Sequence, residues 1–180
     1  MKGVVFTEFL ELVEEKFGYA TVDHIIERSE LSNDGAYTSV GTYDYHDLIR
    51  MVVELSQITG SRVPDLVKFF GHHMFHVFTK AYPELLRTTH CTFEFLPHVE
   101  KAIHVEMRKL YSDAELPSFR FEYPADNEIV MYYQSTRPFA DLAEGLIEAC
   151  AEHFGEPVRI QREDLAPHDG TQARFAITKL

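Results

Sequence analysis

Three donor side chains occupy alternate positions in one short segment: Tyr133, Ser135 and Arg137. At the end of an extended strand, they would project from one face, about two residue rises apart. A phenol, a hydroxyl and a guanidinium together satisfy several carboxylate oxygens, and the hydrogen bond from an arginine is charge-assisted. The pattern therefore describes a clamp for an anion. Taken alone, it more often marks a half-exposed strand whose polar side faces water.

His104 is the second residue whose type can do chemistry. It lies near the apolar edge of a helix expected over residues 92–110, where apolar residues recur at spacings of three and four. Imidazole is the protein ligand of five-coordinate heme iron because it leaves the opposite face of the metal open to a gas. Taken alone, a single histidine at an apolar edge is more often a core or boundary residue than a ligand.

Helical periodicity dominates the first half of the sequence. The spacing of apolar residues predicts helices near residues 3–17, 22–26, 44–55, 64–80 and 92–110. Asp44 is expected to cap the third of these helices, and Pro64 suits the first turn of the fourth. The segment 33–42 contains Gly35, Ser39 and Gly41 and is expected to form a turn-rich loop.

The pattern changes at Pro117, after which apolar residues alternate on both sides of the turn 124–127, as in a hairpin. A helix over about residues 142–150 follows, and two strands flank the turn 168–170. The sequence therefore predicts one α+β domain over residues 1–180. We expect a helical N-terminal subdomain over about residues 1–62, and a C-terminal subdomain with an antiparallel sheet and helices over about residues 63–180.

Composition narrows the possible partners and location. The 17 basic and 29 acidic residues give a formal net charge of −12, which disfavours nucleic acid and anionic membrane surfaces. The N-terminal segment 1–17 contains four glutamates among its apolar residues, unlike a signal peptide or a membrane span. Two cysteines are too few for a disulfide framework and indicate a reducing compartment. A cytoplasmic protein is expected.

Considered together, His104, the segment Leu110-Tyr111-Ser112-Asp113-Ala114-Glu115-Leu116-Pro117 and the run Tyr133-Gln134-Ser135-Thr136-Arg137 resemble the heme nitric oxide/oxygen binding (H-NOX) family. This family includes the heme domain of soluble guanylate cyclase. The resemblance covers essentially the whole chain, from MKGVVF through the loop 35–41 to the C-terminal strand. The Tyr-x-Ser-x-Arg pattern is short, but its position after a helix-borne histidine is specific.

The resemblance implies a stand-alone bacterial member with a b-type heme between the two subdomains. His104 would then be the axial ligand of the iron. The propionates would be bound by Tyr133, Ser135 and Arg137. Pro117 matches the position that presses on the porphyrin and helps to distort it. The pocket on the gas-binding face would be lined by matching positions on two helices, Val5 and Phe9 on the first and Met74 and Phe78 on the helix that covers the same face.

Leu142, five residues after Arg137, is the residue expected to decide which gas binds. Oxygen-binding members of the family carry a donor tyrosine at this position. Oxygen on ferrous heme carries partial negative charge, so losing the donor weakens oxygen binding far more than nitric oxide binding. We expect a sensor of nitric oxide, also binding carbon monoxide, that excludes oxygen. Tyr82 or Tyr132 would replace the donor only if the helix register differed.

The resemblance also implies an output through a separate protein, a histidine kinase or a cyclic-di-GMP enzyme. No catalytic motif is recognisable, so we expect no enzymatic activity. The alternatives are an oxygen or redox sensor on the same fold, and a small heme-free enzyme or binding protein. The cluster His72, His73 and His76 is interpreted as solvated helix histidines, and Cys91 and Cys150 as buried thiols without zinc.

Overall fold

The computed structural model describes residues 1–110 and 113–180, without the side chains of Leu85 and Leu110, so Tyr111 and Ser112 of the H-NOX-like segment lie outside the described residues. The chain begins with a group of three helices. They are α1 (Gly3–Phe17), α2 (Tyr19–Arg28) and α3 (Tyr45–Thr59), close to the predicted ranges. Asp44 caps α3 as predicted, because its Oδ1 accepts a hydrogen bond from the backbone N of His46 at 3.0 Å.

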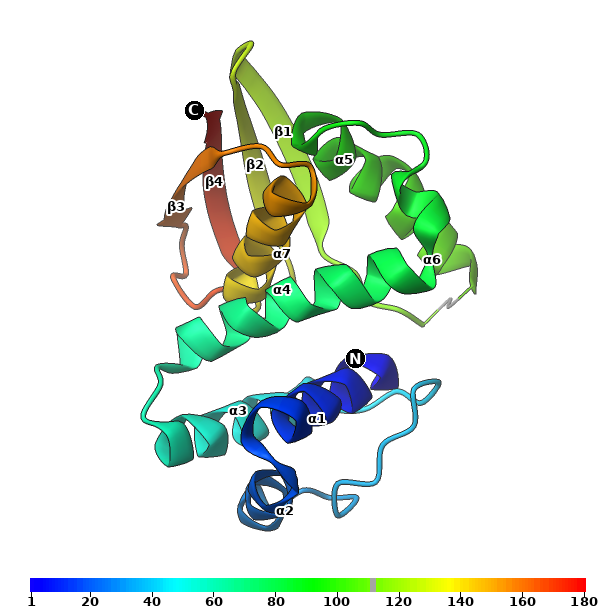
Figure 1. The fold of residues 1–180 in the computed structure, drawn as a ribbon, viewed down its shortest axis with the longest axis vertical. Helices are drawn as coiled ribbons and strands as arrows, with labels where there is room; N and C mark the ends of the chain where they lie inside the picture. Colours follow the sequence, from blue (N-terminus) through cyan, green and yellow to red (C-terminus); the bar gives the residue numbers. More distant parts are fainter. Residues whose placement is uncertain (111–112) are drawn as a thin grey trace.

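Helix α4 (Val63–Ala81) crosses the molecule between the N-terminal helices and the rest of the chain (Figure 1). Pro64 lies in its first turn, as predicted. Phe70 and Met74 pack into the core of the N-terminal helices, whereas Phe75 packs into a second core formed with the sheet. Phe69, on the same helix, is 46% exposed and belongs to neither core.

A four-stranded antiparallel sheet forms the C-terminal half. Its strands are β1 (Ser118–Ala125), β2 (Glu128–Gln134), β3 (Val158–Asp164) and β4 (Gln172–Lys179), in the order β1-β2-β4-β3. The predicted hairpin is confirmed, with Phe119 paired to Tyr133 and Phe121 to Met131. Helix α7 (Ala140–His153) lies against the sheet, between it and α4 (Figure 1). The α+β class is therefore confirmed.

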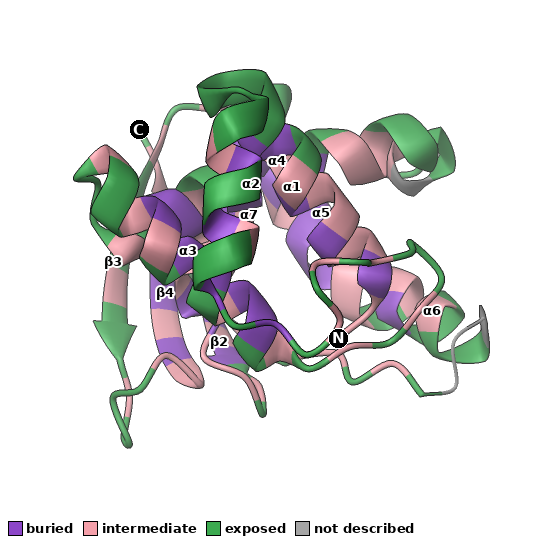
Figure 2. Ribbon diagram, turned by 90° about the horizontal axis from the view of Figure 1, so that it is seen from below, coloured by how far each residue is buried: buried purple, intermediate pink, exposed green. Residues whose placement is uncertain are grey.

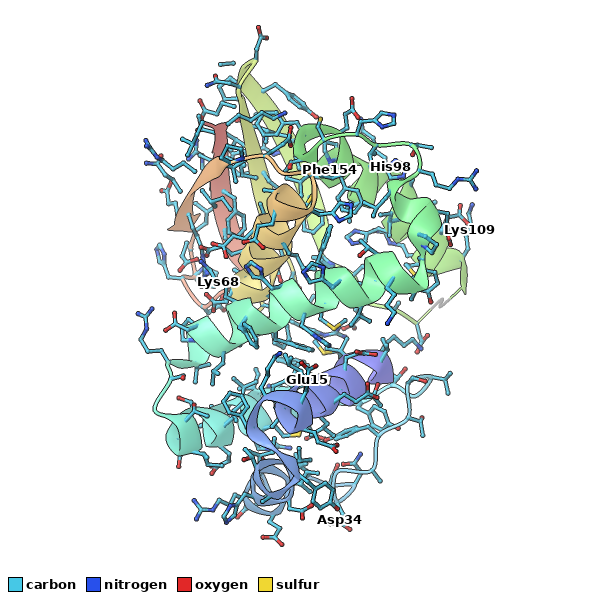
Figure 3. All side chains as sticks on the ribbon, in the orientation of Figure 1. Glu15, Asp34, Lys68, His98, Lys109 and Phe154 are labelled. Atoms are coloured by element: carbon cyan, nitrogen blue, oxygen red, sulfur yellow. The ribbon has the colours of Figure 1, made fainter. Side chains whose placement is uncertain are left out.

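Helices α4 and α7 cross at two glycines. A Cβ atom on Gly145 would lie 2.0 Å from the carbonyl oxygen of Lys68, and one on Gly71 would lie 2.4 Å from that of Leu142. Lys68, labelled in Figure 3, reaches across the crossing and pairs with Glu144 at 2.6 Å. The absence of side chains at both glycines lets the two backbones approach closely.

The segment expected as one α-helix over residues 92–110 is divided. A short 3-10 turn, η1 (Pro83–Leu86), precedes α5 (Thr92–His98), η2 (Val99–Ile103) and α6 (His104–Leu110). The backbone N–H of His104 bonds to the carbonyl of Val99, five residues earlier, so η2 is a π turn. The expected helix over residues 92–110 is therefore present, but it contains a π turn that the apolar spacing did not indicate. A π turn inside a helix is frequently found at a functional site.

Buried positions gather on the inward sides of α1, α3, α4 and α7, while α2 is largely exposed (Figure 2). Two groups of buried side chains result, one among the N-terminal helices and one between α7 and the sheet. Within residues 1–110 and 113–180, no helix is both long and apolar enough to cross a membrane.

Candidate functional site

His104 begins helix α6, directly after the π turn. Only 8% of its surface is exposed, and its Nδ1 lies 2.9 Å from Oε2 of Glu100. Burial lowers the pKa of His104, and the neighbouring Glu100 opposes this shift. Among the described residues, no hydrogen bond is made to Nε2. The structure thus favours a neutral imidazole with one ring nitrogen engaged, the form in which histidine ligates a metal.

Phe119, on strand β1, connects His104 to the predicted clamp. Its ring centroid lies 5.1 Å from that of His104 and 6.1 Å from that of Tyr133. The structure therefore brings His104 and Tyr133 to the same region. The alternating apolar pattern of the sequence predicts only that the side chain of Phe119 faces the core. It does not indicate that Phe119 contacts both His104 and Tyr133.

The clamp residues do not share one strand, because β2 ends at Gln134. Ser135 and Arg137 lie in a turn, where Ser135 Oγ accepts a hydrogen bond from the backbone N of Arg137 at 3.0 Å. The hydroxyl of Tyr133 donates to the carbonyl oxygen of Arg137 at 3.4 Å. The expectation that all three side chains project from a strand face is thus wrong for Ser135 and Arg137. Burial raises the pKa of Tyr133, so its hydroxyl stays protonated as a donor.

The guanidinium of Arg137 is only partly satisfied. One terminal nitrogen donates to Oε2 of Glu115 at 2.5 Å, and the other donates to the carbonyl oxygen of Glu115 at 3.2 Å. Its Nε is buried and has no hydrogen-bond partner among the described residues. A buried donor without a partner is costly, and a carboxylate oxygen would satisfy it. Arg137 therefore fits the carboxylate of a heme propionate. Nothing in the sequence marked Glu115 as its partner.

The five residues expected to line the gas-binding face all belong to the hydrophobic cluster of the N-terminal helices. Phe9 and Met74 are buried in it, and Val5, Phe78 and Leu142 pack against it. None of these five side chains carries a hydrogen-bond donor. Pro117 is partly exposed immediately before β1, in the chain segment between His104 and Phe119.

The two phenols considered as replacement donors are placed elsewhere. Tyr82 follows the last residue of α4 and is 38% exposed. Tyr132 neighbours Tyr133 on β2, and its side chain therefore points to the opposite face of the sheet. There its hydroxyl donates to Glu122 at 3.0 Å.

The three clustered histidines of α4 do not share a common partner. His72 lies 2.9 Å from Glu148 of α7, His73 lies 3.3 Å from Glu8 of α1, and His76 is exposed. In the part of the chain that the structure describes, no three His, Cys, Asp or Glu side chains are arranged to hold a metal ion. An iron held in a porphyrin differs, because one axial side chain is sufficient.

The two cysteines differ in exposure. Cys150 is fully buried, and burial raises the pKa of its thiol to about 12. Cys91 is partly exposed, so the expectation of a buried thiol is wrong for this residue.

Comparison with known proteins identifies a family. The model of the family described as Haem-NO-binding matches residues 2–162. The Fe(II) unliganded H-NOX protein from K. algicida is 42% identical, with a TM-score of 0.94 over 100% of this chain and 97% of that chain. The IWP-051-bound H-NOX from Shewanella woodyi, in the Fe(II)CO ligation state, is 42% identical, with a TM-score of 0.85 over 100% of this chain and 95% of that chain.

A curated relative is similar over a shorter segment. The guanylate cyclase soluble subunit beta-2 of Rattus norvegicus is 33% identical over 93 residues. This match covers 49% of this chain and 13% of that protein, so this chain corresponds to a small part of it.

Proposed function

Because this chain belongs to the haem-NO-binding family, we propose that it is a heme-based sensor of nitric oxide that excludes oxygen and regulates a separate signalling protein. The observation that carries the proposal is the contact of Phe119 with both His104 and Tyr133. This contact joins a candidate axial ligand to a candidate propionate clamp. An unpaired buried donor on Arg137 supports the same assignment.

A bound heme b would supply a ferrous iron that takes up a diatomic gas. We assign the axial position to Nε2 of His104 and the propionates to Tyr133, Ser135 and Arg137. Glu115 accepts hydrogen bonds from both terminal nitrogens of Arg137, so Nε is the donor that would be available to a propionate oxygen. Pro117 is assigned to the porphyrin face on the His104 side.

The gas-binding side is assigned to Val5, Phe9, Met74, Phe78 and Leu142. Their apolar side chains exclude water from that side of the heme and offer no hydrogen-bond donor. Bound oxygen carries partial negative charge, and no hydrogen-bond donor among these side chains would stabilise it. The pocket therefore disfavours oxygen relative to nitric oxide and carbon monoxide. The carbon monoxide state of the Shewanella woodyi relative is consistent with this choice of ligands.

The output is assigned to a change in the relative positions of the helical part, near residues 1–62, and the α+β part. We propose that the chain is not itself an enzyme and acts in the cytoplasm on a histidine kinase or a cyclic-di-GMP enzyme. A net charge of −12 complements a basic face on such a partner.

The test is the absorption spectrum of the heme-loaded, reduced protein under three conditions: anaerobic, in air and with nitric oxide. We expect a nitric oxide complex and no stable oxygen complex. A stable oxygen complex would support the alternative of an oxygen sensor on the same fold. Failure of the protein to retain heme at all would support a heme-free binding protein or enzyme instead.

A further inference from the structure

Glu100 lies one turn before His104 and contacts groups on two different elements. Its Oε2 lies 2.9 Å from Nδ1 of His104 and accepts a hydrogen bond from the backbone N of Phe119 at 3.2 Å. Its other oxygen lies 3.6 Å from a terminal nitrogen of Arg108. Glu100 therefore bridges the π turn, helix α6 and the start of strand β1.

A carboxylate accepts hydrogen bonds and has no hydrogen to donate, so the short contact requires the proton of the imidazole to be on Nδ1. The lone pair of the neutral ring is then on Nε2, the nitrogen assigned above to the iron. We propose that Glu100 is a positioning residue that fixes the tautomer and orientation of His104 and strengthens it as an axial ligand. The inference rests on the proposed function, because it concerns the same heme.

Two features of the site make this bond more than a surface contact. The side chain of His104 is 10% exposed and that of Glu100 is 25% exposed, so both groups are largely shielded from water. The backbone of Phe119 holds Oε2 from the strand side, and the ring of Phe119 packs against the imidazole. A hydrogen bond from a ligating histidine to a carboxylate raises the basicity of the ligand and fixes its ring.

The same chain offers a matched control. Glu106 lies on α6, two residues after His104, but its carboxylate is exposed and pairs with Lys109 at 2.6 Å. Glu106→Gln therefore removes one carboxylate charge from the helix that carries His104 and leaves the contacts of His104 intact. Glu100→Gln keeps the shape of the side chain and a neutral acceptor, whereas Glu100→Leu removes the acceptor.

The experiment measures the stretching frequency of the bond between iron and histidine by resonance Raman spectroscopy of the reduced, gas-free protein. The proton signal of Nδ1–H in the carbon monoxide complex and the rate of heme transfer to apomyoglobin are measured alongside. We expect the frequency to fall in the order wild type, Glu100→Gln, Glu100→Leu. Heme transfer should become about 10- to 100-fold faster in Glu100→Leu. Glu106→Gln should match the wild type in all three readouts.

Wild-type frequencies in both Glu100 variants would overturn the inference and leave the proposed function intact. A shift of the same size in Glu106→Gln would also overturn it, since a general effect of charge would then be sufficient. A wild-type protein that retains no heme would overturn both proposals. Glu100→Gln is the decisive variant if Glu100→Leu fails to fold, because the amide fills the same space.

Discussion

The ring of Phe119 lies 5.1 Å from the imidazole of His104, with the two planes inclined by 38°. These residues are fifteen positions apart and belong to different elements, strand β1 and helix α6. Since β1 also pairs Phe119 with Tyr133 of β2, the sheet supports the candidate axial ligand from one side. The site therefore depends on the register of the hairpin as much as on the helix that carries His104.

Replacement of Arg137 should weaken heme retention. Arg137→Ala removes the donor Nε together with the charge, and one charge-assisted hydrogen bond contributes about 1.5–3 kcal/mol. We therefore expect heme transfer to apomyoglobin to become about 10- to 150-fold faster, measured by stopped-flow absorption. Arg159→Ala, at an exposed position on β3, is the control and should behave as wild type. An Arg137→Ala protein that loses heme at the wild-type rate would exclude a role for this residue in binding the propionates.

Leu142→Tyr should confer oxygen binding. The substitution adds one hydroxyl donor to a group of side chains that has none, and that donor stabilises a gas carrying partial negative charge. The spectrum of the reduced protein in air should then show an oxygen complex with a lifetime of at least minutes. Leu142→Phe adds the ring without the hydroxyl and should bind no oxygen. If Leu142→Tyr also binds none, the distal donor does not decide selectivity.

The two thiols should react at very different rates. Burial raises the pKa of Cys150 to about 12, so at pH 8 a thiol reagent should modify only the partly exposed Cys91 in the native protein. After unfolding, both thiols should react. Native Cys91→Ser should show no fast-reacting thiol, and rapid modification of Cys150 in this variant would contradict the assignment.

The same burial predicts a pH dependence of stability. An unfolded cysteine ionises near pH 8.5, whereas folded Cys150 stays protonated to about pH 12. Between these two pH values the unfolded state binds fewer protons than the folded state. The stability that protonated Cys150 contributes is therefore fully present below about pH 8.5 and is lost as the pH rises. It falls by about 1.4 kcal/mol per pH unit above it. Denaturant unfolding across this range should show a steeper fall in stability in the wild type than in Cys150→Ala.

Gly145→Ala should destabilise the crossing of α4 and α7. Its new Cβ would meet the carbonyl oxygen of Lys68 at 2.0 Å, so one of the two helices must shift. Overpacking of this kind costs about 1–3 kcal/mol, which denaturant unfolding monitored by circular dichroism would detect. Glu152→Ala, at an exposed position on the same helix, should change the free energy of unfolding by much less. Equal midpoints for the two variants would show that the crossing tolerates a methyl group.

Periodicity in the sequence was sufficient to predict the helices, the hairpin and the α+β class, because each buried face repeats its own apolar spacing. It could not reveal the π turn before His104, because the apolar residues on both sides of that turn still recur at spacings of three and four. It also could not pair Arg137 with Glu115, or His104 with Phe119. Such contacts depend on how separate elements pack, and no local pattern records them.

The central claim is that His104 binds the iron of a heme in this chain. Its most direct test is the Soret absorption of the reduced, heme-loaded protein, compared between wild type and His104→Gly with and without added imidazole. We predict that the wild-type band is lost or displaced in His104→Gly and is restored by imidazole, which occupies the space left by the side chain. A His104→Gly protein with an unchanged wild-type spectrum in the absence of imidazole would contradict the claim.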